Sequence, residues 1–173
     1  MRIYILDTGV LLTQWTSKNP DFIFMTTQSV IDEIQNSPSR NRVQSLLSTD
    51  RLRIASPDLE SIEMAEKKAR EMGDYGVLSK EDLELISLSL QQKHLGHKVS
   101  VVSSDLALLN TAAALGLNTL DPKGRMKERI TWMLKCPACG NEGSETTGRV
   151  ECPVCGTEMQ RKPKRKEKIK RAK

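Results

Sequence analysis

The sequence lacks the features that mark several common classes of protein. No apolar run approaches the roughly 20 residues that a membrane-spanning helix needs. The apolar start of the chain meets a charge at Asp7, which is too soon for a secretory signal. Neither G-x-x-x-x-G-K-S/T nor G-x-G-x-x-G occurs, so nucleotide hydrolysis and hydride transfer have little support. We therefore expect a soluble, cytoplasmic protein that does not contact membranes.

Histidine is also scarce, which narrows the chemistry that the chain can perform. Its two histidines, His94 and His97, lie on either side of Gly96 near a predicted helix end. Neither accompanies an evident nucleophile, and we interpret both as surface residues. Chemistry is therefore expected from carboxylates and from the four cysteines.

Four short apolar segments alternate with stretches of helical periodicity. They are residues 3–6, 52–55, 99–102 and 117–120. Strands that alternate with helices predict an α/β fold, in which helices cover both faces of a parallel sheet. The functional site of such a sheet lies beyond the carboxyl ends of its strands.

Four acidic residues stand at junctions between these predicted elements. They are Asp7, Glu33, Asp82 and Asp105. Asp7 and Asp105 follow candidate strands, Asp82 falls in the first turn of a helix that Ser79 caps, and Glu33 lies beside apolar helix positions. Carboxylates that converge need a counter-charge, which a hard divalent cation with oxygen ligands commonly supplies. Such cations activate water and stabilise charge on a phosphodiester during cleavage.

Each acid also has a purely structural interpretation. Asp7 and Asp105 could be helix N-caps, and Asp82 could only complete a capping box with Ser79. Glu33 could merely line a helix boundary, since its neighbour Asp32 looks equally capable of serving the site. Independent caps would not be expected to follow two strands and two intervening helices in this order, so the joint pattern favours a metal-dependent phosphodiesterase.

All four cysteines belong to one pattern, C-x2-C-x12-C-x2-C. They are Cys136, Cys139, Cys152 and Cys155. The two pairs complete a tetrahedral four-thiolate zinc site, which is structural because no position remains open for water. Two disulfides are the alternative, and a reducing cytoplasm disfavours them. Gly140 and Gly156 suit the tight turns that aim backbone N–H groups at the thiolates.

Positive charge is concentrated at the end of the chain. Residues 161–173 hold nine of the 27 Lys and Arg residues and one of the 22 Asp and Glu residues. Dense positive charge without apolar periodicity predicts a disordered segment that is attracted to polyanions. We favour a nucleic-acid contact, with a tail that serves solubility as the alternative. Trp15 and Trp132 are interpreted as packing residues, with base stacking as the alternative.

Four stretches of the sequence resemble a PIN-domain ribonuclease. They are residues 6–8, 27–34, 73–83 and 101–105. With the four-cysteine segment and the basic tail, they make the chain similar to the archaeal Nob-type ribosome-assembly endonucleases. The resemblance implies a PIN-like nuclease domain over residues 1–125, a zinc ribbon over 131–160 and a basic tail over 161–173.

The resemblance also implies an activity and its residues. Asp7, Asp82 and Asp105 would hold Mg²⁺ or Mn²⁺, and Glu33 would complete the catalytic site. The chain would be an endoribonuclease, a hydrolase that matures the 3′ end of the 16S rRNA precursor during ribosome biogenesis. Its partners would be precursor small-subunit rRNA and the pre-30S particle, and one zinc ion would be structural.

The chain departs from the family pattern at two positions. Gln28 stands where the family often has proline, and Ser104 stands where an acid is common. Whether Ser104 or Asp32 joins the site is left open. Two other functions also stay open: a PIN toxin that cuts tRNA or mRNA, and an RNA-binding assembly factor without catalytic activity.

Overall fold

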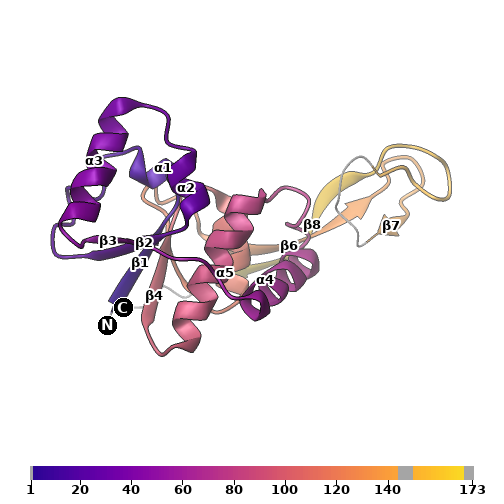
Figure 1. The fold of residues 1–173 in the computed structure, drawn as a ribbon. Helices are drawn as coiled ribbons and strands as arrows, with labels where there is room; N and C mark the ends of the chain where they lie inside the picture. The colour runs from indigo at the N-terminus through magenta and orange to yellow at the C-terminus, as the bar shows by residue number, and fades with distance from the viewer. Residues whose placement is uncertain (1, 144–149, 170–173) are drawn as a thin grey trace.

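Two sheets organise the part of the chain that the computed structural model describes, residues 2–143 and 150–169. The first is a five-stranded parallel sheet with helices packed around it. The second is a three-stranded antiparallel sheet that extends away from the first (Figure 1). This confirms the predicted α/β architecture, followed by a small module that carries the cysteines.

The strands of the parallel sheet are short, and those at its centre are buried. In the spatial order β3-β2-β1-β4-β5, every neighbouring pair is parallel. Their bounds are β1 Arg2–Leu6, β2 Ile23–Thr26, β3 Leu52–Ile54, β4 Lys98–Val102 and β5 Asn118–Leu120. Ile3, Ile5 and Val101 have no exposed surface. Such continuous apolar strands are typical of a sheet that is covered on both faces.

The helices begin and end where local sequence signals place them. Their bounds are α1 Thr8–Leu11, α2 Gln28–Asp32, α3 Ser37–Ser48, α4 Leu59–Met72, α5 Lys80–His94 and α6 Leu106–Ala114. Asp58 caps α4, and Gly73 ends it in the left-handed region at φ 70°. Ser79 and Asp82 form the predicted capping box of α5. No described helix combines the length and the apolar character that crossing a membrane requires.

The strand order places the predicted site at one edge of the sheet. The chain runs outward from β1 through β2 to β3, and then returns to β4 on the other side of β1. Such a reversal leaves a crevice beyond the carboxyl ends of the two central strands. Asp7 directly follows β1, and Asp105 lies a short distance beyond β4.

The second sheet corrects the prediction for the basic tail. We expected residues 161–173 to be disordered, but Gln160–Lys168 form strand β8. This strand pairs antiparallel with β6, Glu128–Lys135, in the register from Glu128↔Lys168 to Lys135↔Gln160, and β7, Glu142–Gly143, flanks β6 on its other side. Residues 170–173 lie outside the described part of the chain.

The physical reason for the ordered tail is that most of its charges need no burial. Lys162, Lys164 and Lys166 are exposed on β8, where water solvates them. Backbone pairing to β6 supplies the hydrogen bonds, and Glu167 forms an ion pair with Arg129 across the two strands. Composition alone predicted disorder because it carries no information about this pairing partner.

A buried acid, Asp74, joins the second sheet to the helices. Its carboxylate has no exposed surface and accepts hydrogen bonds from Asn110 Nδ2 and Thr111 Oγ1 of α6, at 2.6 and 3.1 Å. Arg161 of β8 forms an ion pair with it. The Asn110 amide also donates to the Ile130 carbonyl and accepts from the Ile130 N–H, both at 2.7 Å. These contacts hold β6 and β8 on α6.

Candidate active site

Asp7 is the most deeply placed of the four predicted acids. It occupies the N-cap position of α1, yet its side chain makes no capping hydrogen bond. Its Oδ2 accepts a hydrogen bond from Ser103 Oγ at 2.7 Å. Burial raises the pKa of Asp7, although the Ser103 hydrogen bond opposes this, and the negative charge of Asp82 adds to the rise. The cap interpretation therefore does not explain this side chain.

Asp105 carries out the capping role that its position predicted. Its Oδ1 accepts from the N–H groups of Ala107 and Leu108 at 2.6 and 3.2 Å, which caps α6. Its own N–H donates to Ser103 Oγ at 2.8 Å. Asp105 is exposed, and only Oδ1 serves the cap among the described contacts. A single carboxylate oxygen thus satisfies the helix, while the other remains accessible to a ligand.

Asp82 likewise combines a cap with a place beside the other acids. Its Oδ2 accepts from the Ser79 N–H at 2.9 Å, and Ser79 Oγ accepts from the Asp82 N–H at 3.1 Å. Burial raises the pKa of Asp82, the Ser79 hydrogen bonds oppose this, and the charges of Asp105 and Glu33 raise it further. The capping box is therefore present, and it does not exclude a second role.

Glu33 completes the group from the end of α2, where it is the C-cap residue. It is exposed, and its Oε2 accepts a hydrogen bond from Thr8 Oγ1, the residue that follows Asp7. A contact across 25 positions of sequence brings the end of α2 to the carboxyl end of β1. The charge of Glu33 also acts on Asp82, as described above.

The structure therefore gathers all four predicted acids at one edge of the sheet. Their mutual electrostatic effects link Asp7 to Asp82 and Asp105, and Asp82 to Asp105 and Glu33. No Lys or Arg among the described residues forms an ion pair with any of them. A set of oxygen donors that lacks an internal counter-charge fits a hard divalent cation.

The acids are nevertheless not arranged as the ligands of a single ion. Within residues 2–143 and 150–169, only the four cysteines form a group of three or more possible ligands whose atoms lie close enough to share an ion. Ligation by several carboxylates requires their side chains to approach one another. The exposed Glu33 and Asp105 side chains have the room to do so.

Sequence reasoning missed two hydroxyl groups that position these acids. Ser103 is fully buried and bridges Asp7 and the backbone of Asp105, and Thr8 holds Glu33. Both residues adjoin a strand end beside a predicted acid, and this proximity was the available signal. The sequence left open whether Asp32 or Ser104 joins the site, and both make other contacts. Asp32 accepts a hydrogen bond from Gln28 Nε2 at 2.8 Å, and the Ser104 carbonyl accepts one from Arg125.

The four cysteines lie together at the far end of the second sheet. They are free thiols, with Sγ–Sγ contacts of 3.4 to 3.5 Å and all four atoms within 4.8 Å of one another. A disulfide would need about 2 Å, whereas tetrahedral zinc with Zn–S bonds of about 2.3 Å separates its sulfurs by about 3.8 Å. The donor set therefore fits a closed zinc site and not two disulfides.

Matching turns support each cysteine pair, as the glycines predicted. Gly140 and Gly156 have positive φ values of 75° and 73°, and their N–H groups donate to the carbonyls of Cys136 and Cys152. The Cys139 N–H points at Cys136 Sγ at 3.5 Å. Hydrogen bonds with Thr157 lower the pKa of Cys155 to about 6. At Cys139 the Asn141 N–H lowers the pKa, but hydrogen bonds with the other cysteine sulfurs and burial outweigh it and raise the pKa to about 12.

Comparison with known proteins agrees with this geometry. A family model described as the PIN domain of ribonuclease matches residues 4–91, which is just over half of the chain. Endoribonuclease Nob1 of Pyrococcus abyssi is 29% identical over 141 residues, which cover 82% of this chain and 81% of that protein. Ribonuclease VapC3 of Aeropyrum pernix is 34% identical over 116 residues, 67% of this chain and 83% of the relative.

A eukaryotic relative is similar over a shorter part of its length. The 20S-pre-rRNA D-site endonuclease NOB1 of Saccharomyces cerevisiae is 31% identical over 93 residues, which cover 53% of this chain and 20% of that protein. Of the three names, only that of the yeast relative describes an RNA substrate.

Proposed function

The chain belongs to the PIN-domain family of ribonucleases, and from this premise we propose that it matures the 3′ end of the 16S rRNA precursor. The observation that carries the hydrolytic part is the gathering of Asp7, Glu33, Asp82 and Asp105 without an internal cation. Relatives named Endoribonuclease Nob1 and 20S-pre-rRNA D-site endonuclease support the substrate. The pre-30S particle in the cytoplasm is the corresponding partner.

Three of the four acids share one task in this mechanism. Asp7 and Asp105, beyond the two central strands, would hold Mg²⁺ or Mn²⁺ together with Asp82, and Glu33 would complete the site. When bound, the cation supplies activation of water and stabilisation of charge on the phosphodiester. In-line attack by water at the scissile phosphorus then leaves a 3′-OH and a 5′-phosphate. No side chain needs to act as a nucleophile.

Two hydroxyl groups keep the carboxylates ready for this task. Ser103 donates to Asp7 and accepts from the Asp105 N–H, so one buried side chain fixes both acids beyond the central strands. Thr8 orients Glu33 in the same way. Partners of this kind commonly contribute ten- to a hundredfold to metal affinity or activity.

The basic strand β8 supplies the contact to RNA in this proposal. Lys162, Lys164, Lys166 and Lys168 are exposed along a strand whose backbone is already fixed by β6. An ordered row of cations attracts the phosphate backbone without the entropic cost of ordering a tail. The four-cysteine module would contribute by shape, and binding should weaken as the salt concentration rises.

Two other functions differ from the proposal in features that can be measured. A PIN toxin would cut tRNA or mRNA, and the similarity to VapC3 favours this alternative. Such toxins usually lack a zinc module, whereas the clustered cysteines fit one here. A non-catalytic RNA-binding factor would bind the same RNA without a specific site for Mg²⁺ or Mn²⁺.

The test is cleavage of an RNA that spans the 3′ boundary of small-subunit rRNA, with and without Mn²⁺, followed by mapping of the ends. We expect Mn²⁺-dependent cleavage at the boundary, which Asp7→Asn abolishes while RNA binding survives. Asp58→Asn is the matched control, since Asp58 is an exposed cap of α4 far from the other acids in sequence. Cleavage that persists in Asp7→Asn would contradict the proposal, and exclusive cleavage of tRNA or mRNA would favour the toxin.

A further inference from the structure

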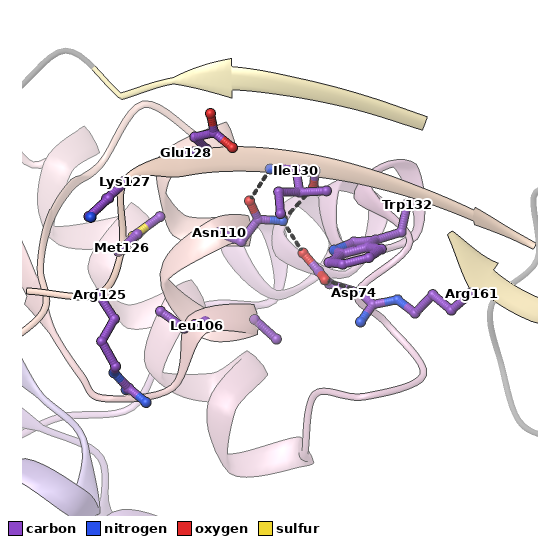
Figure 2. A pocket seen from close by; sticks show the side chains of 11 residues that line it. Asp74, Leu106, Asn110, Arg125, Met126, Lys127, Glu128, Ile130, Trp132 and Arg161 are labelled. Atoms are coloured by element: carbon purple, nitrogen blue, oxygen red, sulfur yellow. Dashed lines mark hydrogen bonds and ion pairs between the residues drawn. The ribbon is translucent and has the colours of Figure 1, made fainter. Parts of the chain in front are cut away.

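A cavity of about 640 Å³ lies between α6 and the strands β6 and β8 (Figure 2). This volume lies within the range of roughly 300–1,000 Å³ that is typical of small-ligand sites. Its apolar lining comes from Leu106, Met126, Ile130 and Trp132. The catalytic role proposed above uses none of these side chains, so the cavity needs an explanation of its own.

The cavity adjoins the chain segment that carries Asp105. Leu106 and Ala107, which line it, directly follow Asp105. Arg125 also lines it, and its guanidinium donates to the carbonyl of Ser104, the residue before Asp105. The first turn of α6 therefore runs from the acid site at Asp105 to the wall of this cavity.

Trp132 presents a ring that the surrounding structure holds in place. The Arg161 guanidinium lies over this ring, with its central carbon 4.2 Å from the ring centroid. Arg161 is itself fixed, because it pairs with Asp74 and donates to the Gly73 carbonyl at 2.9 Å. A half-buried aromatic ring with a fixed orientation is a suitable platform for stacking a nucleobase.

The polar groups of the cavity are already engaged, which limits what they can recognise. The Asn110 amide serves Asp74 and the Ile130 backbone, so it has little capacity left to read a base edge. The charged groups that face the cavity are Arg125, Lys127, Arg161, Asp74 and Glu128. The Asp74–Arg161 pair is internally neutral, which leaves an excess of one positive charge for a phosphate.

We infer that this cavity, defined as the Trp132 pocket, holds the base of a nucleotide next to the scissile phosphate, stacked on Trp132, with Arg125 at the adjoining phosphate. The inference rests on the proposed ribonuclease function and adds a subsite to it. Because stacking supplies the contact and the amide of Asn110 is engaged, the pocket accepts any base and rejects an abasic nucleotide.

The first test uses the fluorescence of Trp132 in the full chain. Trp15→Phe leaves Trp132 as the only tryptophan, and Phe preserves ring contacts with Tyr4 and Phe22. We expect a non-cleavable 2′-O-methyl oligonucleotide to quench this fluorescence saturably, and its counterpart with abasic sites throughout to bind without quenching. Equal fluorescence with both oligonucleotides would overturn the inference.

The second test scans single abasic nucleotides along a cleavable RNA on both sides of the cut. We expect one position next to the cut where the abasic nucleotide lowers kcat/KM about tenfold, the low part of the range for base–aromatic stacking. In Trp132→Leu this position should lose its effect, whereas Trp132→Phe should retain it. A flat scan with intact RNA still cleaved would overturn the subsite and leave the ribonuclease proposal standing. Quenching by RNA that is never cleaved would support base stacking on Trp132 but overturn the ribonuclease proposal, and with it the place of the base beside a scissile phosphate.

Discussion

Asp74 and Asp7 both lie inside the fold, but only Asp74 has a positively charged partner among the described residues. Asp74 is fully buried, and its oxygens receive hydrogen bonds from Asn110 and Thr111 and an ion pair from Arg161. Asp7 is partly buried beside other acids, with one hydroxyl partner and no described cation within ion-pair distance. Burial raises the pKa of both aspartates, but an internal Arg opposes the rise only at Asp74.

The difference separates a structural acid from one that is prepared for a ligand. The fold supplies a counter-charge where the carboxylate joins two parts of the molecule. At the acids around Asp7 the described fold supplies no counter-charge. A bound external cation can supply it, and its binding offsets the free energy cost of crowded carboxylates. Clustered acids alone would not distinguish these cases, whereas the partners of each acid do.

The largest expected effect comes from breaking the structural pair. Arg161→Ala leaves the charge of Asp74 buried without its cation, which should lower the free energy of unfolding by about 3–5 kcal/mol. Arg165→Ala is the matched control, because Arg165 is exposed on the same strand and pairs only with Glu167 among the described residues. Denaturant unfolding should show almost no change for this control. Equal effects of the two substitutions would contradict the structural role of the pair.

The next effect separates capping from catalysis at Asp105. Asp105→Ser keeps a good N-cap residue and removes the carboxylate, so cleavage should fall at least about a hundredfold while the melting temperature changes little. Asp58→Ser makes the same change at the cap of α4 and should affect neither quantity. Full activity of Asp105→Ser would show that Asp105 is only a cap.

A smaller loss is expected when the shared hydroxyl is removed. Ser103→Ala deletes the donor to Asp7 and the acceptor for the Asp105 N–H, which should lower kcat/KM about tenfold and weaken Mn²⁺ binding. Ser89→Ala removes another buried hydroxyl, one that only bonds the Leu85 carbonyl within α5, and should preserve both values. Unchanged Mn²⁺ affinity in Ser103→Ala would remove Ser103 from the site.

The smallest expected effect is a gain in stability. Because the pKa of Asp7 is higher in the folded than in the unfolded state, its contribution to stability declines as the pH rises through these two values. Without divalent cations, Asp7→Asn should therefore raise the stability near neutral pH by about 1 kcal/mol, or the melting temperature by about 2–4 °C.

The pH dependence supplies the control for this gain. The difference in stability between Asp7→Asn and the natural sequence should shrink as the pH is lowered towards the pKa of Asp7 in the unfolded state. Thermal unfolding across a pH series measures this difference. Asp21→Asn removes a charge at an exposed position away from the four acids and controls for the loss of one negative charge. A variant that is less stable near neutral pH would show that the Asp7 charge is already compensated.

Much of the fold could be predicted because local signals agreed with the tertiary structure. The capping box at Ser79 formed as predicted, and the strands before Asp7 and Asp105 are present. Strand β2, Ile23–Thr26, was missed although Ile23, Phe24 and Met25 form an apolar run like those of the predicted strands. Strand β8 was missed because its residues are polar and its order depends on distant pairing with β6.

The candidate site was predictable to the same extent. Asp7, Asp82 and Asp105 could be identified because strand ends and helix starts are visible in sequence, and the ends of parallel strands meet in space. Glu33, at the end of α2, depended mainly on the family resemblance. Ser103 and Thr8 could not be assigned, since a hydroxyl at a strand end is common and its partner lies far away in sequence. Asp74 was missed for the same reason, because Arg161 lies 87 positions away.

The proposed cleavage depends on a divalent cation held by the acids gathered at Asp7. Calorimetric titration of Mn²⁺ into the zinc-loaded protein, Asp7→Asn and Asp58→Asn measures this binding. We expect saturable binding to the natural sequence and to Asp58→Asn, and affinity lowered at least about tenfold in Asp7→Asn. Equal Mn²⁺ affinity in all three proteins would contradict this proposal.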